Sequence, residues 1–437
     1  MVENEQMKAM QEKIQNQEKA EKIWNERKQK NIKKYPIYRM FAWDLLFYYS
    51  IIYLFLTIEK GLTPAEALQF DAFYVLFKSI LQIPCTILIE KIGKRKSIVI
   101  ANVILIIHIV IIMASRSFVD LLISQILCAF AFNIKTVCET DMLYDSLEHG
   151  EKRGIIFSKI DGKANSIYYY MDAISAIIAS FTFVINSYIP LILCMIVLII
   201  AFYFSLQFEE VGLRKKSYTI KEELKNIRYS LRNVFRSKRL RSLLLFNVIF
   251  VAMLRFTQTT RNTVLTTVGL PEQYFGIIFA ILGIISGIAA KEQGKIHKRY
   301  RNRTLAFLAI PMAVSIVFLG IATLWKIDIH IILPIILVFF IIQYSMKGPY
   351  YVLIRQYLNN FTNSEKRIKI TTANNLFENF VVAILLFAFS AILENVNISY
   401  ALLIVGCIML LLVTWVLEYM RNRVGKRAEE YTKRDLI

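Results

Sequence analysis

The sequence predicts an all-α membrane protein in which twelve transmembrane helices form two six-helix pseudo-repeats. Three observations lead to this fold class: about a dozen apolar runs of bilayer-spanning length, basic residues gathered in alternate connecting loops, and features that recur half a chain apart. The 437 residues are 56% hydrophobic, with a mean hydropathy of +0.47. Long apolar runs in a chain of this composition are typical of membrane spans.

The apolar runs place the spans, because roughly 20 apolar residues cross the hydrocarbon core of a bilayer. We expect them at about 40–58, 68–89, 97–115, 119–142, 164–186, 189–207, 242–265, 273–293, 304–324, 331–355, 372–393 and 398–419. They divide the chain into an N-terminal tail (1–38), a first bundle (39–207), a middle loop (208–241), a second bundle (242–420) and a C-terminal tail (421–437). Helical periodicity from Ser217 to Phe235 predicts a surface helix in the middle loop. The N-terminal tail is either an amphipathic helix on the inner leaflet or a solvated helix.

Lysine and arginine set the orientation, because short loops rich in these residues stay on the cytoplasmic side. With both termini inside, the inner segments hold 45 of the 53 basic residues, whereas the outer loops hold only Lys60, Arg116 and Lys326. We therefore expect a multi-pass plasma-membrane protein with both termini cytoplasmic. The first 35 residues contain no apolar core, so the first span, rather than a cleavable signal peptide, directs insertion.

Several functional classes are disfavoured by the sequence. The net charge of +20 lies in loops between spans, so we expect no nucleic-acid partner. The five cysteines lie inside apolar runs and the four histidines are scattered without ligand spacing, so no metal is expected. No GxxxxGK[ST], HExxH or GxSxG motif occurs, so we expect neither an enzyme nor a bound cofactor.

The two halves repeat each other. Gly61-Leu62-Thr63-Pro64 precedes span 2, and Gly269-Leu270-Pro271 precedes span 8. A glycine with nearby bases follows both spans, and Glu-Lys-Arg follows both span 4 and span 10, with offsets of 208, 201 and 214 residues. Parallel repeats of six spans are an architecture of transporters.

The turn between spans 2 and 3, Glu90 to Ser97, is the most distinctive short stretch. Four bases surround Gly93, which permits the positive φ of a sharp reversal. Glu90 ends one helix within reach of the N-terminus of another, where a carboxylate is favoured. We therefore expect a conformational hinge here, made by Glu90, Lys91, Gly93, Lys94 and Arg95.

Six plus six spans, a long middle loop and this turn resemble the major facilitator superfamily. The family's turn pattern, Gly-x-x-x-Asp-Arg-x-Gly-Arg-Lys/Arg, matches at its acid, following base, glycine and later bases: Glu90, Lys91, Gly93, Lys94 and Arg95. Thr86 stands at the first glycine position, and Gln125 stands where the family has an arginine in span 4. The resemblance implies a secondary transporter whose central cavity is enclosed by all spans except the third, sixth, ninth and twelfth.

The resemblance also implies a partner for the hinge. An acid at the inner end of span 4 pairs with the hinge base in the family, which here implies a contact between Asp145 and Lys94. The surrounding segment, Leu143 to Leu147, resembles bacterial members of efflux or unassigned type. The bacterial inner membrane and an exporting direction are therefore what the resemblance implies.

Three acidic residues inside spans are candidates for proton coupling. An ionisable side chain in the bilayer is costly unless it is paired or hydrated, so each one is a functional candidate. Asp172 lies near the middle of span 5 after three tyrosines, Asp44 lies in span 1, and Glu378 lies in span 11. The alternative for Asp44 is a structural pair with Lys78 or Lys135, and for Glu378 a bond to Lys347 or Arg355.

Basic and polar residues inside spans are candidates for the substrate cavity. Arg255, Gln258 and Arg261 belong to a polar stripe on span 7, and arginine suits a carboxylate or phosphate group through its planar fork. The alternative is a salt bridge from this stripe to Asp172 or Glu378. Lys347 precedes Gly348-Pro349, a gate or a static kink in span 10. The full set is Lys78, Lys135, Tyr169, Arg255, Gln258, Arg261 and Lys347.

We expect a monomeric secondary active transporter that moves a small amphiphilic, anionic or zwitterionic solute by alternating access, with protons driving export. Two alternatives remain open at this point. One is proton-coupled uptake of a nutrient solute. The other is a non-transporting membrane sensor that binds a partner through its basic tail and middle loop. The expected partners are a small-molecule substrate, protons and membrane lipid.

Overall fold

The computed structural model describes residues 2–148, 153–211, 220–300, 303–325, 327–361, 364–421 and 424, and within them the chain is helical without strands. The first bundle comprises α1 (Val2–Ala42), α2 (Ile52–Leu54), η1 (Phe55–Glu59), α3 (Pro64–Ile92), α4 (Lys94–Ala114), α5 (Phe118–Ser146), α6 (Arg153–Ile185) and α7 (Ile189–Leu206). The middle loop contains α8 (Ile220–Arg236). The second bundle comprises α9 (Lys238–Thr267), η2 (Glu272–Tyr274), α10 (Phe275–Lys291), α11 (Gln293–Tyr300), α12 (Thr304–Leu324), α13 (Ile329–Phe361), α14 (Ser364–Asn395) and α15 (Ile398–Arg421).

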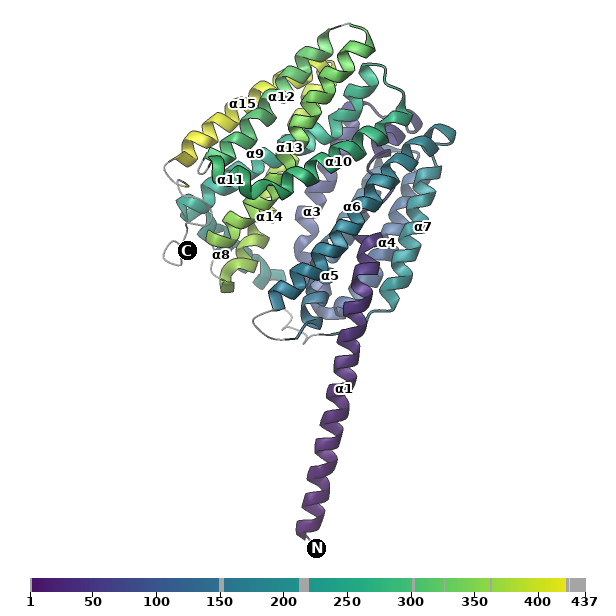
Figure 1. Cartoon of the computed structure of the whole chain (residues 1–437), viewed down its shortest axis with the longest axis vertical. Helices are drawn as coiled ribbons and strands as arrows, with labels where there is room; N and C mark the ends of the chain where they lie inside the picture. The colour runs from purple at the N-terminus through teal and green to yellow at the C-terminus, as the bar shows by residue number, and fades with distance from the viewer. Residues whose placement is uncertain are drawn as a thin grey trace.

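The two bundles lie side by side, and α1 projects from the first as an isolated rod (Figure 1). We call the end from which α1 projects the tail end and the opposite end the far end. Eleven helices of the described chain are long and apolar enough to cross a membrane, and they coincide with the second to twelfth expected spans. The predicted twelve-span fold class is confirmed, and the first span differs from its prediction in one respect that is described below.

Local sequence explains where the long helices begin. Thr63 and Glu66 form a reciprocal capping box at the start of α3, with Pro64 in its first turn. Ser117 and Asp120 form the same motif at the start of α5. These caps satisfy backbone amides that have no partner inside the helix. The second and fourth spans therefore have fixed starting points at the far end.

Within each bundle, the helices pack closely where side chains are small. In the second bundle α12 lies against α15, where Gly320 approaches the backbone of Leu403 and Gly406 approaches that of Val317. In the first bundle α4 lies against α5 and α7. Small residues let helix backbones approach closely, which favours van der Waals packing between membrane helices.

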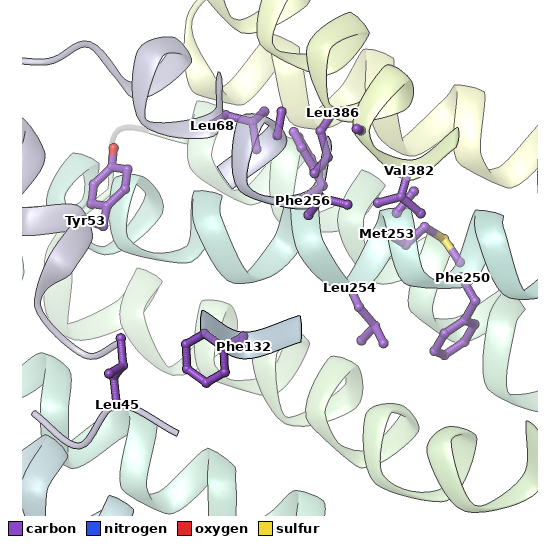
Figure 2. Packing of buried hydrophobic residues seen from close by; sticks show 14 of the residues in the cluster. Leu45, Tyr53, Leu68, Phe132, Phe250, Met253, Leu254, Phe256, Val382 and Leu386 are labelled. Carbon is purple, nitrogen blue, oxygen red and sulfur yellow. The ribbon is translucent and has the colours of Figure 1, made fainter. Parts of the chain in front are cut away.

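Two helix pairs make the most extensive contacts between the bundles, α3 with α14 and α6 with α10, and α3 also touches α9. Figure 2 shows Leu68 of α3 beside Leu386 of α14, next to Phe256 and Met253 of α9, which is largely buried. The α3–α14 seam is closed along its length. The Ser390 hydroxyl donates to the Ala65 carbonyl at 2.9 Å near the far end, and the Ser79 hydroxyl donates to the Leu376 carbonyl at 3.0 Å further down.

Candidate functional site

The first span carries Asp44 on a non-helical stretch. Helix α1 ends at Ala42 and helical structure resumes at Ile52, so the prediction of a continuous span over 40–58 is wrong. Phe47 has a φ of +66°, a value that a right-handed helix excludes. The Leu45 amide donates to the Asp44 carboxylate at 3.0 Å, and the Phe47 amide donates to the Ser175 hydroxyl of α6 at 3.3 Å. Such side-chain bonds compete with helical ones.

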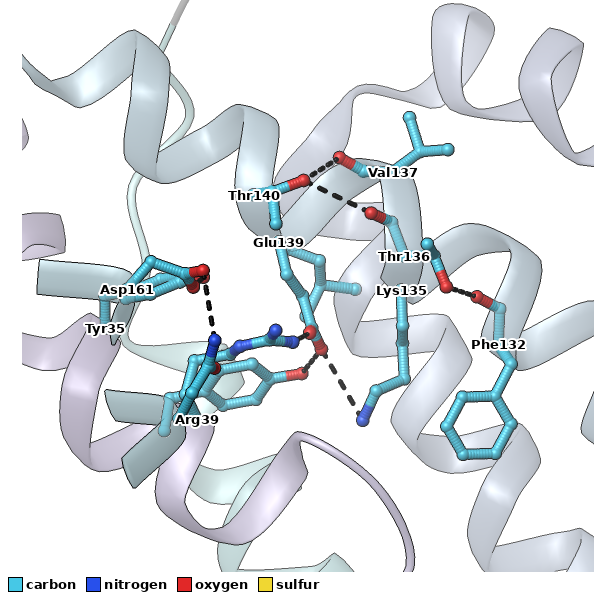
Figure 3. A network of polar contacts seen from close by, with 12 residues as sticks. Tyr35, Arg39, Phe132, Lys135, Thr136, Val137, Glu139, Thr140 and Asp161 are labelled. Atoms are coloured by element: carbon cyan, nitrogen blue, oxygen red, sulfur yellow. Dashed lines mark hydrogen bonds and ion pairs between the residues drawn. The ribbon is translucent and has the colours of Figure 1, made fainter. Parts of the chain in front are cut away.

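Immediately before this break, α1 is anchored to α5 through Glu139 (Figure 3). The Glu139 side chain is 1% exposed and accepts hydrogen bonds from the Arg39 guanidinium and, at 2.6 Å, from the Tyr38 hydroxyl. The Lys135 ammonium lies 3.5 Å from the same carboxylate and donates to Asn102 at 3.3 Å. Two bases and a tyrosine thus compensate one buried acid. This placement supports a role for Lys135 in anchoring α1, and its predicted contact with substrate stays a prediction.

Charged side chains from both bundles gather between them. They come from the non-helical stretch, α3, α6, α9, α13 and α14. Electrostatic interactions connect them across the boundary. The set contains four acids and four bases: Asp44, Asp71, Asp172, Glu378, Lys78, Arg255, Arg261 and Lys347. Its formal charge is therefore zero when every member is ionised. Seven of the eight are sequence-predicted candidates, and the structure brings these seven together.

Asp172 faces bases of the other bundle without forming an ion pair. The charged groups that act on it most strongly are Asp44, Lys347 and Arg261. Among the described residues, no basic nitrogen lies within 4.0 Å of the Asp172 or Asp44 carboxylate. Arg261 donates to the Tyr344 hydroxyl and lies over the Phe279 ring at 3.6 Å. The carboxylates of Asp44 and Asp172 thus lie near positive charges, but among the described residues they form no ion pair with them.

Asp71 is the charged residue that sequence reasoning missed. Arg255 of α9 donates to its carboxylate at 3.0 Å, which makes an ion pair between the bundles. Asp71 sits early in span 2, where a carboxylate is expected to lie at the membrane surface. The available signal was spacing, because Asp71, Tyr74 and Lys78 recur at intervals of three and four on one face of α3. The Tyr74 ring lies 5.8 Å from both the Arg255 guanidinium and the Lys78 ammonium.

Glu378 is bonded to an amide. Its carboxylate accepts a hydrogen bond from the Asn247 side chain of α9, and the Asn247 oxygen in turn accepts one from the Tyr350 hydroxyl. The charged groups that act most strongly on Glu378 are Lys78 and Arg255. In the described part of the chain, its alternative bond to Lys347 does not form. Gln258 is half-buried on α9, between Arg255 and Arg261.

Helices α6 and α10 meet at the far end and separate toward the tail end, and Figure 1 shows their ribbons diverging in this direction. A Cβ on Gly276 would lie 2.0 Å from the Ala176 carbonyl oxygen, so the two backbones touch there. Gly283 and Gly287 recur on the same face of α10, yet a Cβ on either would have no neighbour within 4 Å. On α6, Tyr169 shares the face of Ala176 and is 60% exposed. The backbones of α6 and α10 therefore do not touch at Gly283 or Gly287, and Tyr169 is accessible on this seam.

The turn between α3 and α4 contains Gly93 with a φ of +91°. The Lys94 ammonium donates to the Asp145 carboxylate of α5 at 2.6 Å, which is the contact implied by the sequence, and Asp141 lies 3.6 Å away. Lys91 is exposed and Glu90 is half-buried on the last turn of α3. Their predicted role in a conformational hinge stays a prediction.

A distant residue caps α4. The Glu210 carboxylate, which follows span 6, accepts hydrogen bonds from the backbone amides of Lys94 and Arg95 at 2.9 and 3.0 Å. A Cβ on Gly93 would lie 2.9 Å from the same carboxylate, so glycine serves both the turn and this close approach. Sequence reasoning assigned the acid at a helix N-terminus to Glu90, and the carboxylate bonded to the first amides of α4 is that of Glu210.

The segment around Glu210 also holds the tail. The Asn31 side chain donates to the Glu209 carbonyl at 2.9 Å and accepts from the Glu209 amide at 2.9 Å. The Lys30 ammonium hydrogen-bonds to the Glu209 carboxylate at 2.6 Å and lowers the pKa of that glutamate. Helix α1 is thus tied to the same segment that caps α4.

Comparisons with known proteins identify the architecture. Residues 38–340, more than half of the chain, match the family model described as Major Facilitator Superfamily. No curated protein sequence matches the chain.

Solved structures are similar over nearly the whole chain. A crystal structure of the nucleoside transporter NupG superposes with a TM-score of 0.70 at 11% identity, covering 90% of this chain and 99% of that one. A D-xylose-proton symporter has a TM-score of 0.67 at 14% identity, covering 92% and 99%. A POT family transporter in complex with 5-aminolevulinic acid has a TM-score of 0.66 at 11% identity, covering 91% and 95%. At these identities the likeness shows the fold alone.

Proposed function

This chain belongs to the major facilitator superfamily and is a secondary transporter, and from that premise we propose that it moves a small anionic, zwitterionic or amphiphilic solute by alternating access. The two bundles rock about the charged set between them. One observation carries the proposal: Asp172 of the first bundle faces Lys347 and Arg261 of the second, with no ion pair at its carboxylate among the described residues. Opposite charges held close but unpaired are suited to a ligand or proton that completes them.

The composition of the charged set supports the solute class. With all members ionised, four acids balance four bases, so the site presents bases to an anionic group and carboxylates to a cationic group of the same solute, and a proton on Asp172 competes with that cationic group. Arg255 is already paired with Asp71. Lys347 and Arg261 are therefore the bases that we assign to an anionic group of the solute, and Tyr169, Gln258 and Lys78 complete the proposed cavity.

We assign the coupling between proton movement and solute transport to a carboxylate. Asp172 carries the transported proton in this proposal, and Asp44 and Glu378 are the further candidates. Charged carboxylates at membrane depth are unfavourable without compensation, so proton uptake and solute binding at one charge cluster become linked. Protons entering along their gradient then drive export of the solute.

The orientation follows from the basic residues. We place both termini in the cytoplasm of a bacterial cell, with the monomer in the plasma membrane, because 45 of 53 basic residues fall on that side. The accessible α6–α10 seam then opens to the cytoplasm, which is the conformation that loads a solute for export. The exporting direction rests on the resemblance of Leu143 to Leu147 to efflux-type members.

The test is flux in proteoliposomes that contain the purified full-length protein and an imposed pH gradient. A panel of amphiphilic antibiotics and organic anions is offered, and export predicts that substrate moves against the direction of proton flow. Asp172→Asn is expected to abolish pH-driven flux at normal protein level, because the side chain keeps its shape but can no longer exchange a proton.

Glu418→Gln is the matched control, since its side chain is 73% exposed at the end of α15. It should retain wild-type flux. Unchanged pH-driven flux in Asp172→Asn would remove Asp172 from the mechanism. Substrate that moves with the protons would replace export by uptake.

A further inference from the structure

Helix α8 carries a stripe of five basic residues that the transport site does not use. Its bases follow one another at intervals of four, three, four and four residues: Lys221, Lys225, Arg228, Arg232 and Arg236. Because successive helical residues are about 100° apart, these five side chains fall within an arc of about 80°. We call them the basic stripe.

The basic stripe is open to the surroundings. All five side chains are exposed, and within the described chain none of them forms an ion pair or a hydrogen bond with another residue. Two exposed apolar side chains flank the stripe, Leu224 at 51% and Tyr229 at 65% exposure. A concentrated row of unneutralised positive charge between two apolar side chains is complementary to an anionic amphiphile.

The side of α8 next to the stripe fixes the helix to the protein, because Leu231 and Phe235 lie about 100° and about 60° from the centre of the stripe. Leu231 packs against Ile83 and Ile87 of α3 and against Ala373 of α14, and the Phe235 ring lies 5.1 Å from the ring of Phe377. The helix therefore does not need to bury its apolar face in lipid, and it touches both bundles at the α3–α14 seam.

The position of α8 brings the stripe to the depth of lipid headgroups. Only Ser237 separates α8 from α9, which is a membrane-crossing helix that starts at Lys238. Arg236 is thus two residues away from a span, and the rest of the helix extends from this fixed point. Anionic headgroups attract basic residues at this level, and the attraction falls off within a Debye length.

We propose that the basic stripe of α8 binds the headgroups of anionic phospholipids at the tail end of the protein. The stripe supplies the charge, Leu224 and Tyr229 supply contacts with the upper acyl region, and the packing of Leu231 transmits the occupancy to both bundles. The proposal is independent of which solute the central site carries.

The experiment measures lipid binding to the purified full-length protein in detergent. Native mass spectrometry counts the phosphatidylglycerol and phosphatidylethanolamine molecules that remain bound when both lipids are titrated. Wild-type protein is expected to retain phosphatidylglycerol preferentially. The variant K225Q/R228Q/R232Q is expected to bind phosphatidylglycerol on the order of a hundredfold more weakly, because three surface charges near headgroups are removed.

The matched control is K295Q/K298Q/R299Q, which removes three exposed bases from α11. It should retain phosphatidylglycerol as the wild type does. Because all six substituted side chains are exposed, both variants should keep the wild-type unfolding temperature. If the triple variant unfolds, the single variant R228Q takes its place, and its loss of affinity for phosphatidylglycerol should be proportionally smaller.

Several outcomes would overturn the proposal. Equal phosphatidylglycerol binding by the stripe variant and the wild type is one, and an equal loss in the control variant is another. Polyglutamate and a DNA duplex are tested in parallel as soluble polyanions. Stripe-dependent binding of either polymer, without retention of phosphatidylglycerol, would show that the ligand of the stripe is a macromolecule and not a lipid.

Discussion

Glu210 illustrates how one side chain from a distant part of the sequence completes a local turn. Its carboxylate receives two backbone amides at the start of α4, where the helix dipole also favours negative charge. The sequence could predict Gly93 and the Lys94–Asp145 contact, because a glycine among bases and a family resemblance point to them. It could not predict Glu210, which lies in a loop without periodicity, so that only tertiary structure brings it to the turn.

Glu210→Gln is expected to destabilise the protein by about 1 kcal/mol, because a neutral amide is a weaker acceptor for these amides than a charged carboxylate. The measurement is the thermal unfolding midpoint in detergent. Glu418→Gln, whose side chain is 73% exposed, should leave the midpoint unchanged. An unshifted midpoint in Glu210→Gln would mean that the cap contributes no stability.

Glu209 gives a pH dependence at the junction of α1 and the capping segment. The Lys30 hydrogen bond lowers the pKa of Glu209, so the pair stabilises the folded state above the usual glutamate pKa of about 4.3. This contribution is lost as the pH falls through the lowered folded-state pKa. The pair is exposed, so its contribution is about 0.2–1 kcal/mol.

The measurement compares the unfolding midpoints of the wild type and Glu209→Gln across pH. The difference should be largest at neutral pH and disappear in acid. A difference that grows with acidity would reverse the assignment.

At the scale of elements, the contact of α6 with α10 depends on one glycine. Gly276→Ala is expected to impair transport, because its Cβ would meet the Ala176 backbone at 2.0 Å and the two helices must separate. Overpacking of this kind costs about 1–3 kcal/mol. The far end would then close less often, which slows the cycle.

Gly283→Ala on the same helix is the control, since its Cβ would have open space within 4 Å. Proteoliposome flux is the readout for both variants. Equal flux in Gly276→Ala and Gly283→Ala would show that close contact at Gly276 is dispensable.

Most elements were predictable because length and apolarity define a membrane span. Spans 2 to 12 all appear as helices, and the middle-loop helix expected near 217–235 is α8 at Ile220–Arg236. The break in the first span was not predictable, since residues 40–58 are apolar enough for a helix. It depends on the Asp44 carboxylate bonding the next amide and on Ser175 of another helix receiving the Phe47 amide.

At the scale of the whole molecule, the Asp71–Arg255 pair connects the two bundles. Asp71→Asn should destabilise this conformation by between about 1 and about 3 kcal/mol, because the partly buried Arg255 loses its compensating charge. The double variant Asp71→Asn/Arg255→Gln should recover part of the loss. Unfolding midpoints of the wild type, both single variants and the double variant form the cycle that measures the coupling.

Additive effects in that cycle would show that the two residues are not coupled.

The charged set as a whole was largely predictable, since ionised residues inside apolar spans are conspicuous. Its electrical balance was not, because Asp71 sits near the end of a span, and its spacing with Tyr74 and Lys78 places it on their face of α3 without showing that this face meets Arg255 of the other bundle.

The rod formed by α1 has a mechanical consequence. Its 41 residues extend over about 60 Å without interruption up to Ala42, and it is held first by Asn31 on the Glu209 backbone and then, nearer its base, by Arg39 on Glu139. A force at the N-terminal end of α1 acts on these contacts over a long distance. The first non-helical residues beyond them are those of the stretch that holds Asp44. A force that tilts the outer part of α1 therefore acts on these contacts, which lie directly before the stretch that holds Asp44 between the two bundles.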